Sequence, residues 1–292
     1  MEAIVRIEEL RSKLKAARRN KANAEGEVRV GFMPTLGYMH EGHMSLIRQA
    51  RRECDIVVVS IFVNPLQFGP TEDFDKYPRD NERDLSLAEE AGADYVFLPS
   101  VTEMYPAPTK TTVVVKELTD TLCGASRPGH FDGVATVVTK LFNIVQPDRA
   151  YFGMKDAQQV AVIEQFTRDL NIPVQIVRCE TLREPDGLAM SSRNVYLNEE
   201  ERKQALVLSK SLSQAESWMA EPDMTVGKLE LNIRRMIESA PLAVIDYVTI
   251  LTYPGLEPVT GAQPFNGEHP ILVALAVKFG KTRLIDNRIF FS

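Results

Sequence analysis

Hydrophobic and polar positions alternate along the first part of the chain in a regular strand and helix order. Apolar stretches at 28–32, 55–63 and 95–98 have the length and β-branched content of buried strands. The segments 43–52 and 79–91 between them show the spacing of amphipathic helices. A strand, a helix and a second strand in this order place both strands parallel in one sheet.

The same alternation continues to about residue 180. From Gly133 onward, apolar residues lie on one helical face, at positions 134, 137, 138, 141, 142 and 145. Further strands are predicted at 149–152 and 174–178, with a helix at 156–170 between them. The predicted fold class is therefore α/β, with a Rossmann-like parallel-sheet domain at the N-terminus.

After Ser192 the pattern changes. Asn198, followed three residues later by Glu201, forms a capping box that predicts a helix to about residue 218. A second helix is predicted at 226–238, and strands at 244–252 and 271–278. We therefore expect a Rossmann-like domain over residues 1–181 and a smaller α+β domain over residues 182–292, with the boundary inside 181–193.

Composition and charge narrow the class of protein. The 292 residues are 44% hydrophobic and 25% charged, which suits one or two packed domains. The net charge of −6 disfavours nucleic acid as a partner, because such proteins carry a basic face. The longest apolar run is shorter than the roughly 20 residues that a membrane span needs, and the first residues show no secretion signal. We therefore expect no membrane association.

The number and spacing of the cysteines indicate the redox environment of the protein. Cys54, Cys123 and Cys179 are odd in number and far apart, which fits neither a disulfide framework nor a zinc site. Such a pattern is typical of a reducing environment, so we expect a cytoplasmic protein.

Four unusual segments each follow a predicted strand, at 33–43, 64–68, 153–159 and 184–193. In an open parallel sheet, ligands bind beyond the carboxyl ends of the strands. We therefore expect these four segments to form one composite site.

His40 and His43 stand three positions apart at the start of a predicted helix. The zinc-protease pattern needs its histidines four positions apart, so this pair does not match it. A helix N-terminus offers free N–H groups and a partial positive charge that bind phosphate, and Gly42 lets a ligand or backbone approach closely. The alternative is that His40 caps the helix and His43 packs on the sheet.

Lys155 and Asp156 open the next candidate segment. Lys155 is expected on an open loop, where a compact charge on a flexible stem suits phosphate. Asp156 is a candidate Mg²⁺ ligand, because Mg²⁺ often binds one or two carboxylates together with substrate phosphates. Asp156 and Gln159 also fit a capping box, and both interpretations can hold together.

Ser191, Ser192 and Arg193 lie on the last segment. The Arg193 guanidinium can bind phosphate through two parallel hydrogen bonds, and the two hydroxyls can donate to phosphate oxygens. The alternative is an ordinary surface turn.

Uncharged and basic groups complete the candidates. Asn64 and Gln67 offer amides that suit a hydroxyl or carboxylate ligand, or they belong to a simple turn. Arg127 and His130 lie in a Gly- and Pro-containing loop that can close over anions. The same loop can equally lead into a helix with Asp132 as its cap.

Five sequence blocks carry a family resemblance. They are MPTLGYMHEGHMSL from Met33, FVNPLQFG from Phe62, GHFDGVAT from Gly129, YFGMKDAQQ from Tyr151 and REPDGLAMSSRN from Arg183. In this order they resemble the pantothenate synthetase family of pantoate–β-alanine ligases, within the nucleotidyltransferase superfamily. Positions 36, 38 and 39 vary within the first block.

The resemblance implies an activity. Family members condense pantoate with β-alanine, using ATP and Mg²⁺, through a pantoyl-adenylate, and release AMP and pyrophosphate. It also implies a homodimer and a C-terminal domain that acts as a lid. The alternatives are an adenylyltransferase that keeps the nucleotide in its product and a nucleotide-binding regulator without activity. The amides of Asn64, Gln67 and Gln159 favour a small polar acid as the substrate.

The resemblance also implies residue roles. The expected catalytic residues, which stabilise charge on the phosphates, are His40, His43, Lys155 and Arg193, with His40 as the candidate proton donor. The expected ATP-binding residues are Met33, Pro34, Thr35, Leu36, Gly37, Tyr38, Met39, His40, Gly42, His43, Gly153, Met154, Lys155, Asp156, Leu182, Met190, Ser191, Ser192 and Arg193. The expected pantoate and β-alanine residues are Asn64, Gln67, Gln159, Arg127 and His130, and Asp156 is the expected Mg²⁺ residue.

Overall fold

The computed structural model describes residues 1–25, 28–70, 72, 74–259, 261 and 270–291. In these residues the chain forms a six-stranded sheet with the order β1-β4-β3-β2-β5-β6, in which every strand pair is parallel. The strands are β1 (Glu2–Ile4), β2 (Val30–Thr35), β3 (Ile56–Ile61), β4 (Tyr95–Phe97), β5 (Arg149–Gly153) and β6 (Gln175–Cys179). The predicted parallel sheet is confirmed.

Helices cover both faces of this sheet. They are α1 (Ile7–Glu25), α2 (Glu41–Glu53), α3 (Asn81–Ala91), α4 (Val101–Met104), α5 (Leu122–Ser126), α6 (His130–Val145) and α7 (Ala157–Asp169). All six residues of β3 are buried, and they alternate between two cores. Val58 packs with α6 and α7, and Val59 packs with α2 and α3. A strand buried on both faces explains its unbroken apolar run.

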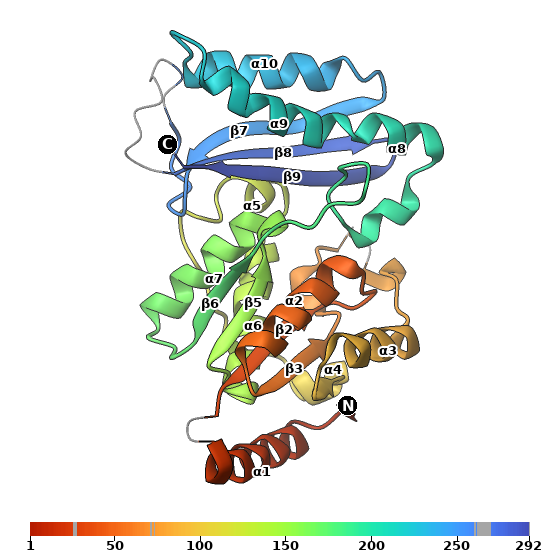
Figure 1. Cartoon of the computed structure of the whole chain (residues 1–292), viewed down its shortest axis with the longest axis vertical. Coiled ribbons are helices and arrows are strands. Elements are labelled where there is room, and N and C mark those ends of the chain that lie inside the picture. The colour runs from red at the N-terminus through yellow and green to blue at the C-terminus, as the bar shows by residue number, and fades with distance from the viewer. Residues whose placement is uncertain (26–27, 71, 73, 260, 262–269, 292) are drawn as a thin grey trace.

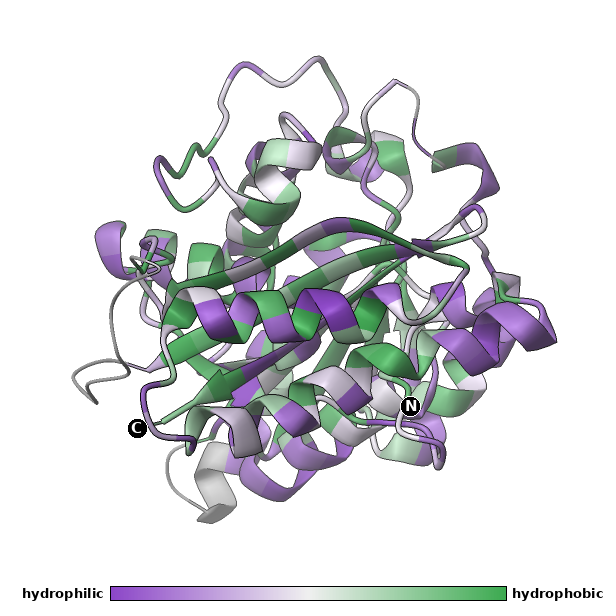
Figure 2. Ribbon diagram, turned by 90° about the horizontal axis from the view of Figure 1, so that it is seen from above, coloured by the Kyte–Doolittle hydropathy of each residue, from purple (hydrophilic) through white to green (hydrophobic). Residues whose placement is uncertain are grey.

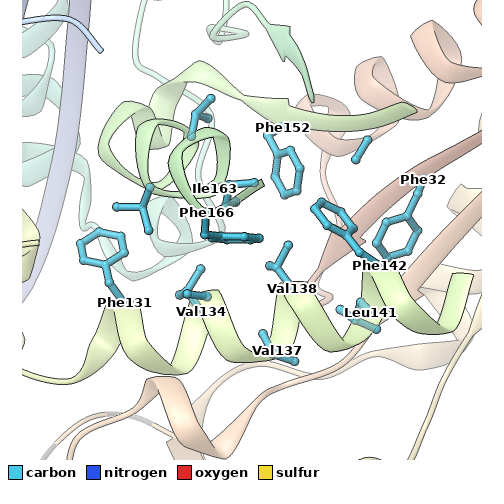
Figure 3. Packing of buried hydrophobic residues seen from close by; sticks show 14 of the residues in the cluster. Phe32, Phe131, Val134, Val137, Val138, Leu141, Phe142, Phe152, Ile163 and Phe166 are labelled. Atoms are coloured by element: carbon cyan, nitrogen blue, oxygen red, sulfur yellow. The ribbon is translucent and has the colours of Figure 1, made fainter. Parts of the chain in front are cut away.

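The core beneath α6 and α7 is rich in aromatic rings (Figure 3). The Phe142 ring lies 6.4 Å from the rings of Phe32 and Phe152 and 6.3 Å from that of Phe166, between centroids. Two of these pairs are edge-to-face, the arrangement that aromatic quadrupoles favour. This core fixes α6 and α7 against the strands whose ends form the site.

The C-terminal part forms a second layer of structure. Its elements are α8 (Glu199–Ala205), α9 (Val207–Met219), α10 (Val226–Glu238), β7 (Ala243–Thr252), β8 (Ile271–Phe279) and β9 (Thr282–Phe290). The three strands form an antiparallel sheet in the order β7-β8-β9. Figure 1 shows α9 and α10 on the outer face of this sheet, while its other face points toward the parallel-sheet part.

The structure differs from the predicted elements in several places. The capping box of Asn198 and Glu201 is confirmed, but the helix predicted to 218 is two helices that meet at Leu206. Strand β9 was not predicted, because polar and charged residues, among them the buried Asp286, interrupt its apolar positions. Segments β1 and α1 at the N-terminus were also not predicted.

The buried hydrophobic residues form three cores. One core joins α8, α9 and α10 to the small sheet, and the others lie on the two faces of the large sheet. A few residues of the small sheet, among them Leu272 and Ala274, pack with the larger core. Hydrophobic residues concentrate on the strands, and the helices show hydrophilic stretches (Figure 2). The domain limits 1–181 and 182–292 stay a prediction.

None of the helices in the described residues is long and apolar enough to cross a membrane.

Candidate active site

The four expected site segments meet at the carboxyl ends of four neighbouring strands, β3, β2, β5 and β6. They contain the 3₁₀ turn η1 (Pro65–Gln67), the start of α2, the turn η3 (Met154–Asp156) and the approach to η4 (Ser192–Tyr196). Chain order reverses between β2 and β5, which is the point where open α/β sheets bind ligands. A cavity of about 270 Å³ lies among these segments.

Most of the expected site residues line this cavity. The five that do not are Gly37, Tyr38, Met39, Met154 and Asn64. Met39 has no exposed surface and belongs to the core under α2. A larger cavity of about 1220 Å³ adjoins it between the two sheets and shares Lys155, Asp156 and Arg193 with it.

His40 and His43 form a reciprocal cap at the start of α2. The Nδ1 atom of His40 accepts from the backbone N–H of Gly42 at 3.2 Å. The backbone N–H of His40 donates to Nδ1 of His43 at 3.3 Å. The capping interpretation of His40 is therefore confirmed, and it coexists with a position in the cavity. Because both Nδ1 atoms accept, each neutral ring carries its proton on Nε2.

Both histidines are neutral at pH 7 in the free protein. Desolvation in the cleft, reinforced by the charge of Lys155, lowers the pKa of His40 to about 4. Desolvation, with smaller contributions from His40 and Lys155, lowers the pKa of His43 to about 3. The rings thus present neutral N–H donors, not the imidazolium charges that a protonated pair would supply.

Gly42 is required by the cap itself. A Cβ at this position would lie 2.8 Å from Cε1 and 2.9 Å from Nδ1 of the His40 ring. The missing side chain lets the imidazole lie directly against the first turn of α2.

Two cations face the same cavity. The Lys155 ammonium pairs with the Asp156 carboxylate at 3.1 Å, and the Lys155 side chain is only 20% exposed. The expected open loop is therefore wrong, since Lys155 lies in the turn η3. The Arg193 guanidinium has no ion pair among the residues that the structure describes. An unpaired guanidinium next to a helix N-terminus is suited to an anionic ligand.

Asp156 does not form the expected capping box. It occupies the cap position of α7, but its side chain makes no cap hydrogen bond. The charges of Lys155 and Arg193 outweigh its desolvation and hold the pKa of its carboxyl below the ordinary value. An ionised carboxylate therefore stands next to the cationic groups of the cavity.

Asn64 takes a different place from the one expected. Its side chain is 1% exposed. It donates to Gly133 O at 3.1 Å and to Gln67 Oε1 at 3.3 Å, and it accepts from the Tyr105 hydroxyl at 2.9 Å. These contacts leave it no donor for a ligand, so it orients Gln67. The Nε2 group of Gln67 has no partner within the described part of the chain.

Arg127 and His130 also have internal partners. Arg127 grips the Glu72 carboxylate with two hydrogen bonds of 2.6 Å. His130 Nδ1 lies 2.8 Å from Gln67 O, so it must donate, and its Nε2 faces Arg127 at 3.0 Å. Desolvation and the Arg127 charge lower the pKa of His130 to about 4. The alternative with Asp132 as cap is wrong, because Gly129 is the cap residue of α6 and Asp132 lies inside the helix.

Sequence reasoning missed Asp84 on α3. It is fully buried, and its carboxylate accepts from the backbone N–H groups of Tyr38 and Met39, both at 2.7 Å. It therefore anchors the turn that leads into His40. Asp84 shares a helical face with the buried Ala88 and Ala91, and a charge on an apolar stripe was the signal available in the sequence.

The described residues hold no group of three or more His, Cys, Asp or Glu side chains placed to bind a metal ion. A single carboxylate such as Asp156 fits Mg²⁺ only where phosphates supply other ligands.

Comparisons with known proteins agree with this geometry. The family model for pantoate-beta-alanine ligase matches residues 2–289. A pantothenate synthetase from Acetivibrio thermocellus is 57% identical over 98% of this chain and 99% of its own length. One from Pelotomaculum thermopropionicum is 58% identical over 89% of this chain and 90% of its own length.

Solved structures show the same likeness. The pantothenate synthetase from Thermus thermophilus matches with a TM-score of 0.89 and 44% identity, over 100% of both chains. The pantoate-beta-alanine ligase from Francisella tularensis, described as complexed with beta-gamma ATP and beta-alanine, matches with a TM-score of 0.75 and 33% identity. It covers 99% of this chain and 97% of that one.

The parallel sheet carries anion-binding groups at its switch point, and the chain matches these relatives over nearly its whole length. Together these findings define an enzyme of the ligase class. The chain belongs to the pantoate–β-alanine ligase family, and its reaction forms the amide bond between pantoate and β-alanine.

Proposed function

We propose that this chain joins pantoate to β-alanine with ATP through a pantoyl-adenylate, releasing pyrophosphate and then AMP. The observation that supports this most directly is the convergence, on one cavity, of four phosphate-binding features. These are the N-terminus of α2, the Nε2–H donors of His40 and His43, the Lys155 ammonium and the unpaired Arg193 guanidinium. The Francisella relative described with a nucleotide and β-alanine supports ATP as the co-substrate.

The first step brings two anions together. A pantoate carboxylate attacks the α-phosphate of ATP, and pyrophosphate leaves with the bonding electrons. Lys155, Arg193 and the helix terminus offset the repulsion where negative charge develops. His40 and His43 contribute neutral hydrogen bonds, and His40 is the proposed donor to the leaving oxygen. Fixed donors need no reorganisation during the reaction, which is their catalytic advantage.

Pantoate is proposed to lie beside Gln67 and Gln159. Both amides line the cavity, and Asn64 holds the Gln67 amide so that Nε2 stays free. Valines 134, 137 and 138 of α6 line the same cavity and can receive the apolar methyl groups of pantoate. The β-alanine amine then attacks the acyl carbon of the adenylate, the amide forms and AMP leaves.

Mg²⁺ is proposed as part of the nucleotide complex. Asp156 is the residue that would hold it, and its lowered pKa keeps the carboxylate ionised. When bound, the ion would neutralise phosphate charge.

We further propose that the enzyme is a homodimer of the cytoplasm, with the small domain over residues 182–292 as its lid. The three cysteines are free and form no disulfide, which fits a reducing compartment. Sedimentation of the purified chain tests the dimer.

The product distribution tests the reaction. The chain is incubated with ATP, Mg²⁺, pantoate and β-alanine, and the products are separated. We expect pantothenate, AMP and pyrophosphate in equal amounts. A product that retains the nucleotide would instead identify an adenylyltransferase, and nucleotide binding without turnover would identify a regulator.

A further inference from the structure

Strand β9 of the small sheet reaches the phosphate-binding turn of the large one. The side-chain Nδ2 of Asn287 donates to the carbonyl oxygens of Met154 at 2.9 Å and of Lys155 at 2.7 Å. Both carbonyls belong to η3, the turn that carries Lys155. One amide therefore holds this turn from an element more than 130 residues later in the chain.

The preceding residue of β9 holds the neighbouring loop. Asp286 is 2% exposed and accepts from both terminal nitrogens of Arg183, at 2.7 Å and 2.9 Å. Arg183 also donates to Gly187 O at 3.2 Å. This pair fixes the beginning of the segment that ends at Arg193, and it anchors β9 beside Asn287.

The position of the Lys155 ammonium depends on its backbone. Its side chain is long and flexible, and Asp156 is its only side-chain partner among the described residues. An orientation set by the backbone of η3 is therefore transmitted directly to the ammonium. Figure 1 shows β9 and its sheet next to the parallel-sheet part, and the packing of β9 against η3 agrees with this view.

We propose that Asn287 is a positioning residue for Lys155. It fixes the backbone of η3 so that the ammonium faces the phosphates, and the small domain thereby completes the site as well as covering it. The proposal rests on the adenylate-forming reaction proposed above. It predicts that Asn287 affects the first half-reaction and acts only through Lys155.

The test compares neighbouring residues of β9. Pantoate-dependent exchange between pyrophosphate and ATP is measured for Asn287→Ala and for Arg288→Ala at saturating substrates. Arg288 is the matched control, because its guanidinium pairs with Glu216 of α9 at 2.6 Å instead of holding η3. We expect the exchange rate of Asn287→Ala to fall about tenfold or more, and the exchange rate of the control to stay within about twofold of the unaltered enzyme. In the complete reaction, kcat/KM for β-alanine should stay unchanged in Asn287→Ala, because it depends on the second half-reaction alone. Equal rates for both variants would overturn the proposal.

A double variant separates positioning from general damage. In the Lys155→Ala background, adding Asn287→Ala should cause no further loss, because a residue that acts through Lys155 has nothing left to position. A second, multiplied loss would contradict the proposal even if the single variant is slow.

Folding is checked by thermal melting before each assay. If Asn287→Ala does not fold, Asn287→Ser replaces it, since serine keeps one short donor and should show a smaller fall in the same direction. An unaltered enzyme without exchange would instead refute the proposed function, and the positioning role with it.

Discussion

At the scale of single residues, the cationic side chains of the site fall into two groups. Some form ion pairs within the protein, and others are free to bind a ligand. Arg127 is held by Glu72 through two short hydrogen bonds. The Arg193 guanidinium has no ion-pair partner in the described residues, and Lys155 has only the partly exposed carboxylate of Asp156. The free or weakly held charges are the ones available to ATP.

Lys155→Ala should therefore damage catalysis far more than folding. Loss of one preorganised charge should lower kcat about 100-fold or more. Loss of a partly exposed ion pair should cost at most about 1 kcal/mol of the free energy of unfolding. Turnover and urea denaturation are measured together, with the exposed Lys203 changed to alanine as the control. A variant with a much lower urea midpoint and normal turnover per folded molecule would contradict the role.

His130 links stability to pH. Its folded pKa of about 4 lies below the ordinary value of 6.5, so the unfolded chain binds a proton between these values and the folded chain does not. The contribution of the neutral His130 ring to the free energy of unfolding is therefore fully present above pH 6.5 and is lost as the pH falls toward 4.

The change His130→Gln isolates this contribution. Glutamine keeps one donor and one acceptor but does not titrate. The urea midpoint should fall less between about pH 7.5 and about pH 5.5 in this variant than in the unaltered protein. Equal falls would show that His130 does not titrate as the structure indicates.

Residue types alone predicted part of this site. His40, His43, Lys155 and Arg193 were found because their types and order are specific, and the structure brings them to one cavity. The internal role of Asn64 was not predictable, because Tyr105, one of its partners, lies 41 residues away in the chain. The contact of Asn287 with η3 was not predictable for the same reason, because the two lie more than 130 residues apart in the chain.

At the scale of elements, α6 and η1 approach each other closely at Gly133. A Cβ on Gly133 would lie 2.2 Å from Leu66 O and 2.6 Å from the Cα of Gln67. These are backbone atoms, so one of the two elements would have to shift. The contact therefore sets the distance between Gln67 and the apolar wall of α6.

Gly133→Ala should separate these elements. We expect a loss of about 1–3 kcal/mol in the free energy of unfolding, despite the better helix propensity of alanine. The KM for pantoate should rise more than the KM for ATP. The control is Gly255→Ala, whose added Cβ meets no atom closer than 3.5 Å. An equally stable Gly133→Ala variant with an unchanged KM for pantoate would show that the contact does not shape the pocket.

Elements with a strong periodicity were predicted well. The runs that became β3 and α6 have apolar residues at nearly every buried position. Strand β9 was missed because Asp286 and Asn287 interrupt its pattern, and these two residues are the ones that contact the loops of the site. The alternation of apolar and polar residues in this strand is therefore interrupted at the residues that contact the active-site segments.

At the scale of the whole molecule, the reaction is proposed to run in two steps within one site. We propose that pantoate reacts with ATP in this cavity before the amine takes part, and that the small sheet contributes to the site. The phosphate-binding groups lie on segments that follow strands of the large sheet, and the larger cavity is lined by such segments together with residues of the small sheet.

Exchange of labelled pyrophosphate into ATP reports the first of these steps alone. The purified chain is supplied with ATP, Mg²⁺ and pantoate and with no β-alanine. We predict exchange that requires pantoate, followed by release of AMP and pantothenate when β-alanine is added. Exchange that needs β-alanine from the start, or none at all while ATP still binds, would contradict a pantoyl-adenylate formed at this site.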